Sequence, residues 1–135
     1  MATEFHAFLK SDKQPTVAEL SRALSSRGFA FSFSGDTALN ERTDLGLTVD
    51  GNAHAVTVTT IEAGTPAWAE LASGAHDRPD GETLLKVIKN CNRRITFSAD
   101  GEAATWARDV ARGASLLAVG AFENVQKGSL LFYGG

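Results

Sequence analysis

The side chains that most often take part in catalysis are a single cysteine, Cys91, and three histidines at His6, His54 and His76. A cysteine nucleophile needs a histidine to accept its proton and a third group to orient that histidine. None of the three histidines forms a local signature with Cys91, which closes an amphipathic helix pattern three residues after Ile88. This position is typical of a small buried hydrophobic side chain rather than a nucleophile.

The histidines themselves give little support for a catalytic or metal site. His54 shares a predicted strand face with Val56 and Val58, so it either lines a pocket or begins the strand half-exposed. His76 and Asp77 lie in a turn-rich stretch that we interpret as a solvated turn. Zinc sites need three or four ligands at characteristic spacings, and no such cluster is visible. We therefore predict no catalytic residues and no metal site.

The longest polar segment runs from Gly35 to Asp44 and is predicted to be an exposed loop. Its acidic residues do not follow the spacing of a calcium loop, and the glycines of the chain follow neither phosphate-binding pattern, so we expect no cofactor. Loops carried on a rigid sheet are where recognition groups tend to lie. We predict a partner-binding surface made by the acidic residues of this loop and of the turn at 76–81: Asp36, Glu41, Asp44, Asp77 and Asp80.

Composition is that of an ordinary folded domain, with 135 residues, 43% of them hydrophobic and 21% charged. A net charge of −3 gives no strong electrostatic attraction to nucleic acid or anionic lipid, so we expect neither as a partner. No run approaches the roughly 18 apolar residues that span a bilayer, and the first residues lack a secretory signal. One unpaired cysteine fits a reducing compartment. We predict a soluble, cytoplasmic, single domain over residues 1–135.

Hydrophobic periodicity predicts an α+β fold with a largely antiparallel sheet. The first half begins with a capping box at Thr16–Glu19, which starts a helix over about 17–27. A strand at 29–33 and a hairpin that turns at Asp50–Asn52 complete an α-β-β-β meander. Two short helices follow, the first begun by Thr65-Pro66 and the second capped by Asp80.

The second half is predicted to be a β-α-β-β unit. Its elements are a strand around 95–97, a helix from about 103 that ends at Gly113, a strand over 116–122 and a final strand at 129–133. Nothing in the sequence determines the order of the strands in the sheet.

These features favour a binder over an enzyme, and our leading hypothesis is a non-catalytic protein-binding module. In size and charge the chain is similar to the small immunity proteins with which bacteria neutralise a cognate toxin, an analogy of class. One alternative is a small hydrolase or ligand-binding protein whose pocket uses His54 or Cys91. Another is a homo-oligomeric structural subunit, which a concentration-dependent mass in solution together with exposed apolar strand edges would distinguish.

Overall fold

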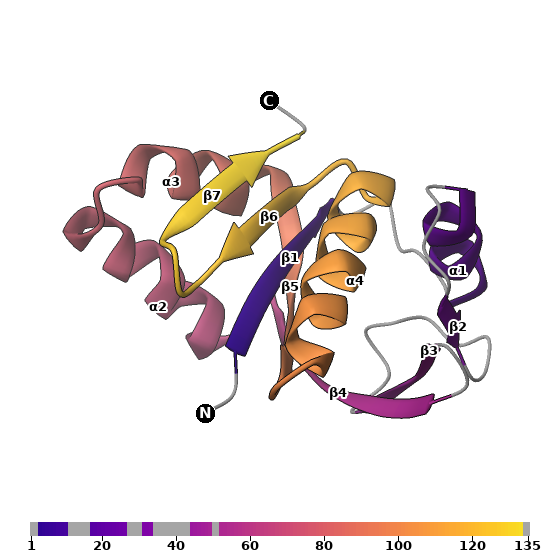
Figure 1. The fold of residues 1–135 in the computed structure, drawn as a ribbon. Coiled ribbons are helices and arrows are strands. Elements are labelled where there is room, and N and C mark those ends of the chain that lie inside the picture. The colour runs from indigo at the N-terminus through magenta and orange to yellow at the C-terminus, as the bar shows by residue number, and fades with distance from the viewer. Residues whose placement is uncertain (1–2, 11–16, 27–30, 34–43, 50–51, 134–135) are drawn as a thin grey trace.

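One antiparallel sheet with helices on both faces organises the described chain (Figure 1). The computed structural model describes residues 3–10, 17–26, 31–33, 44–49 and 52–133. The strands are β1 (Thr3–Lys10), β2 (Phe31–Phe33), β3 (Asp44–Val49), β4 (Asn52–Glu62), β5 (Cys91–Ala99), β6 (Ala121–Asn124) and β7 (Ser129–Phe132). The helices are α1 (Val17–Ser26), α2 (Pro66–Gly74), the 3₁₀ turn η2 (Ala75–Asp77), α3 (Gly81–Asn90) and α4 (Ala103–Leu117). The α+β class and the antiparallel sheet are confirmed.

The sheet has the order β2-β3-β4-β5-β1-β6-β7, with every neighbouring pair antiparallel. The predicted meander is present as β2, β3 and β4, and the predicted β-α-β-β unit as β5, α4, β6 and β7. Strand β1, which was not predicted, lies between β5 and β6 and joins the two halves. Its alternation of Phe5, Ala7 and Leu9 with His6 and Phe8 is a strand pattern, but apolar residues stand on both faces.

Helix α4 runs to Leu117, so the prediction that it ends at Gly113 was wrong. The strand predicted over 116–122 was misplaced for the same reason, because residues 116 and 117 are helical and β6 begins only at Ala121. Gly113 is buried inside the helix, and the chain turns only after Ala118. There Gly120 N–H donates to Ser115 O at 2.9 Å and Val119 N–H donates to Leu116 O at 3.2 Å, the two bonds of a Schellman motif.

The residue at the turning point is Val119, with a φ of 51°, instead of the usual glycine. A β-branched side chain in the left-handed region is a strained conformation. The neighbouring glycine is needed one position later, because a Cβ on Gly120 would lie 1.7 Å from the carbonyl oxygen of Phe8. The backbone at Gly120 lies so close to β1 that only glycine fits at this position. Gly113, in contrast, does not end the helix.

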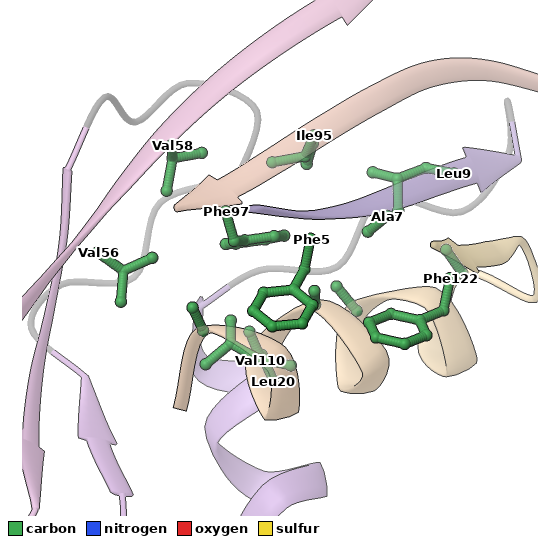
Figure 2. Close-up of a cluster of buried hydrophobic side chains, with 14 of the residues drawn as sticks. Phe5, Ala7, Leu9, Leu20, Val56, Val58, Ile95, Phe97, Val110 and Phe122 are labelled. Carbon is green, nitrogen blue, oxygen red and sulfur yellow. The ribbon is translucent and has the colours of Figure 1, made fainter. Parts of the chain in front are cut away.

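The larger core lies between the sheet and helices α1 and α4 (Figure 2). Alternate residues of β1, β4 and β5 point into it, including Phe5, Val58 and Phe97, and α4 contributes mainly alanines. Small side chains on α4 let the helix approach the sheet closely. A fully buried side chain such as Phe97 contributes about 1.5–3 kcal/mol relative to an exposed one.

A smaller core on the opposite face lies under α2 and α3, where Phe8, Trp68, Leu84 and Val87 meet. Helix α2 begins as predicted, because the Thr65 side chain accepts a hydrogen bond from Trp68 N–H at 3.3 Å and Pro66 follows it. None of the helices in the described segments is long and apolar enough to cross a membrane.

Candidate functional site

A network of charged side chains ties the segment between α2 and α3 to the sheet. We call this segment, residues 75–81, the connector. Arg78 at its centre donates from Nε to Asp80 Oδ1 at 2.7 Å and from Nη2 to Asp80 Oδ2 at 2.8 Å. The same Nη2 also donates to Oε2 of Glu123 on β6. The other carboxylate oxygen of Glu123, Oε1, lies 2.7 Å from Nδ1 of His6 on β1. These four side chains form the ion network.

Strand register explains why residues far apart in the sequence meet here. His6 stands directly opposite Glu123 on β6 and opposite Thr96 on β5. Because side chains alternate along a strand, His6 shares the face of Phe8, which belongs to the core under α2 and α3. The connector therefore crosses the same face of the sheet, within reach of Glu123.

Glu123 is a buried carboxylate with only 4% of its surface exposed. Burial raises its pKa, but the hydrogen bonds with His6 and Arg78 outweigh that effect, so the pKa lies below its ordinary value. An ionised carboxylate only accepts hydrogen bonds, and the proton at this contact therefore belongs to Nδ1 of His6. Glu123 is thus held as an anion between two donors.

The outer end of the ion network is also charged. The Arg78 guanidinium lowers the pKa of Asp80 more than burial raises it. The hydrogen bond to Asp80 raises the pKa of Arg78, burial opposes this, and Glu123 adds to the increase. Arg78 therefore remains a cation that bridges two carboxylates, one partly exposed and one buried.

Around Arg78 the connector surrounds a depression of about 280 Å³. Its lining comes from the connector and the first turns of α3: Ala75, His76, Arg78, Pro79, Gly81, Glu82 and Leu85. The backbone folds tightly, because Arg78 N–H donates to Ala75 O and Gly81 N–H donates to Arg78 O, both at 3.2 Å. A Cβ on Gly81 would lie 2.1 Å from Ala75 O, so only glycine fits there. The rim combines the exposed carboxylate of Glu82 with Leu85, which is 38% exposed.

The five acidic residues predicted to bind a partner are distributed between two regions. Asp36 and Glu41 lie outside the described residues, with most of the predicted loop. Asp44 is the first residue of β3, opposite Thr57, so it belongs to a strand and not to the predicted loop. Asp77 and Asp80 both belong to the connector and flank Arg78. Only this last pair is shown close together.

Asp80 occupies the N-cap position of α3 but makes no capping hydrogen bond with its side chain, contrary to the sequence prediction. Its two carboxylate oxygens are used by Arg78 instead. The bidentate, charge-assisted pair with the guanidinium engages both oxygens, and the carboxylate therefore does not cap the helix.

His54 and Cys91, the residues considered for catalysis, lie on opposite faces of the sheet. The His54 ring lies 4.3 Å from the Trp106 ring of α4, on the face of the larger core. Cys91 is buried in the smaller core, where desolvation raises the pKa of its thiol to about 11. The two side chains are therefore not brought together, and the thiol is protonated at neutral pH.

We expect the Cys91 thiol to react very slowly with a water-soluble disulfide reagent in the folded protein at pH 7.5 and stoichiometrically after denaturation. Both burial and the raised pKa suppress the thiolate that such reagents need. The measurement is release of the coloured thiol with and without urea. A fast stoichiometric reaction of the native protein would show that Cys91 is accessible and ionised.

Sequence reasoning did not identify His6, Arg78 or Glu123 as a unit. The alternation in residues 3–10 is the signal that could have placed His6 on a strand face, and a glutamate within an apolar strand could have been suspected of having a partner. In the part of the chain that the structure describes, no three His, Cys, Asp or Glu side chains gather in a way that could hold a metal ion. Comparison with protein-family models, curated proteins and solved structures yields no match for this chain.

Proposed function

We propose that the protein is a non-catalytic protein-binding module that contacts its partner through the connector and the first turns of α3. The observation that carries the proposal is the anchoring of Arg78 by the buried Glu123, which holds an exposed, concave segment in one conformation. A contact surface that is already ordered loses less conformational entropy on binding. Neutralisation of a toxin, as by an immunity protein, is the specific form of binding that we propose.

The surface chemistry of this region suits a partner with a basic, partly apolar face. Asp77 and Glu82 are exposed acidic side chains, while Leu85 and Pro79 supply apolar area beside them. Apolar contacts near the centre of an interface supply most of the affinity, and charges at the rim mainly raise the association rate. Because Asp80 already shares its charge with Arg78, we assign partner recognition to Asp77 and Glu82 instead.

The test is capture of partners from the native host with the intact protein, followed by affinity measurements on the identified partner. We expect the L85A substitution to weaken binding about tenfold or more, mainly through faster dissociation. The double substitution D77A/E82A should mainly slow association and reduce its dependence on salt.

A matched control is E102A, which removes an exposed carboxylate at the start of α4, on the other face of the sheet. It should leave both rate constants unchanged. Binding by L85A and by D77A/E82A with the affinity of the unmodified protein would refute the connector as the contact surface.

A further inference from the structure

A second depression, of about 360 Å³, lies on the face of the sheet opposite the connector, between α4 and the β6–β7 turn. We call it the α4 groove. Phe5 lies at its floor, and Thr105 and Arg108 line it from α4. The opposite wall is formed by Asn124 at the end of β6 and by Gln126 and Lys127 in the turn. It shares no lining residue with the depression at the connector.

The wall formed by the turn is firmly attached to β1. Gln126 accepts from Glu4 N–H at 2.6 Å and donates from Nε2 to Glu4 O at 2.9 Å, so its side chain pairs with β1 much as a neighbouring strand would. Asn124 Oδ1 accepts from Gln126 Nε2 at 3.1 Å and from Lys127 N–H at 3.3 Å. The α4 groove is therefore preorganised rather than formed by a loose turn.

The polar atoms that this arrangement leaves available at the α4 groove are mostly hydrogen-bond donors. The side-chain oxygen and nitrogen of Gln126 both form hydrogen bonds with the backbone of Glu4, and the side-chain oxygen of Asn124 accepts two hydrogen bonds. The side-chain nitrogen of Asn124 is then the amide group that can donate to a ligand. Lys127 contributes an ammonium group. Arg108 contributes a guanidinium whose Nε is buried without a hydrogen-bond partner among the described residues, and this Nε forms an ion pair at 3.6 Å with Oδ1 of Asp109, a residue outside the groove lining. None of the residues that line the α4 groove is acidic. These donors and cations favour an anion.

The remaining lining is apolar. Phe5 is 4% exposed and stacks on Phe122, with ring centroids 6.1 Å apart, so the floor is a fixed aromatic surface. Ala104 adds a small apolar side chain on α4. A hydrated inorganic ion would leave this surface uncovered, whereas an organic anion would cover it.

We propose that the α4 groove binds a small organic carboxylate, with its apolar body against Phe5 and Ala104 and its carboxylate group between Arg108 and Lys127. This inference is independent of the proposed connector surface, because the two sites lie on opposite faces of the sheet. Binding at one site requires no residue of the other.

The test is a titration of the intact ¹⁵N-labelled protein with benzoate, monitored by NMR. We expect saturable shifts at the backbone amides of Thr105 and Lys127 and at the Nε–H of Arg108. The R108Q substitution should weaken benzoate binding about tenfold, because a charge-assisted bidentate contact is lost. The K127Q substitution should weaken it by a smaller factor, because the Lys127 side chain is exposed and its ammonium is a point charge.

The K86Q substitution on α3 is the matched control and should leave the affinity unchanged. Arg108 has 42% of its side chain exposed, so R108Q should retain the fold, which the unaltered remainder of its spectrum would verify. Parallel titrations with inorganic phosphate and with benzylamine should give at least tenfold weaker binding. Equal affinity of R108Q and the unmodified protein, tighter binding of phosphate than benzoate, or unsaturable shifts spread over all lysines and arginines would each overturn the proposal.

Discussion

Replacing Gly120 with alanine is expected to lower the free energy of unfolding by about 3 kcal/mol or more. The added methyl group would lie 1.7 Å from the carbonyl oxygen of Phe8 and 2.8 Å from its carbon. These atoms belong to the backbone of β1, which is paired on both sides in the sheet, so they cannot move without disturbing β5 and β6. Urea unfolding followed by circular dichroism measures the change.

The matched control for this substitution is G74A. A Cβ on Gly74 meets nothing within 4 Å, and its backbone is helical with a φ of −74°. Alanine there should be neutral or should stabilise the protein by about 0.5 kcal/mol, because it restricts the unfolded chain. An unfolding midpoint of G120A equal to that of G74A would show that the turn after α4 can move away from β1.

The E123Q substitution is expected to lower the free energy of unfolding by about 3 kcal/mol at pH 7. It leaves Arg78 and His6 without their shared anion in a site where Glu123 is buried. The pair of Glu62 with Arg93 provides the comparison, because 54% of the Glu62 side chain is accessible to solvent, although Arg93 is only 12% exposed. The E62Q substitution should cost less than about 1 kcal/mol.

The effect of E123Q should also depend on pH. The pKa of Glu123 is lower in the folded protein than its ordinary value, so the folded state favours the ionised form. The resulting stabilisation is fully present above the pKa of the unfolded chain and is lost as the pH falls through the folded pKa. Urea titrations from pH 7 down to acidic pH should therefore show the difference between E123Q and the unmodified protein becoming smaller. A difference that is the same at every pH, or no larger than that of E62Q, would contradict this account of the ion network.

Capping and turn patterns in the sequence correctly predicted a helix start and a hairpin, because both are determined by residues close together in the chain. The helix start at Thr65-Pro66 and the β3–β4 hairpin both depend on residues close in sequence, and both are present. The predicted end of α4 was wrong because Gly113 was interpreted as a stop, whereas the helix continues with Gly113 on its buried face and the chain turns at Val119. Tertiary packing overrides the intrinsic preference of a glycine in such a position.

The ion network could not have been predicted in the same way. His6 and Glu123 are separated by 117 residues and meet only because β1 pairs with β6. Asp80 shows that a prediction can also fail for residues close in sequence. Its position before α3 indicated a helix cap, but the guanidinium of Arg78, two residues away, binds both of its carboxylate oxygens. Strand order, which the sequence left open, determines which charges become neighbours.

The position of β1 has a consequence for how this chain is made. Strand β1 leaves the ribosome before β5 and β6, the two strands that pair with it, and these are completed only at residues 99 and 124. Until then its apolar residues on both faces, Phe5 and Phe8 among them, have no sheet to enter. Pairings this distant in sequence are slow to form, because loop closure must precede the contacts that stabilise it. We therefore expect β1 to expose apolar side chains during synthesis until β5 and β6 have been made.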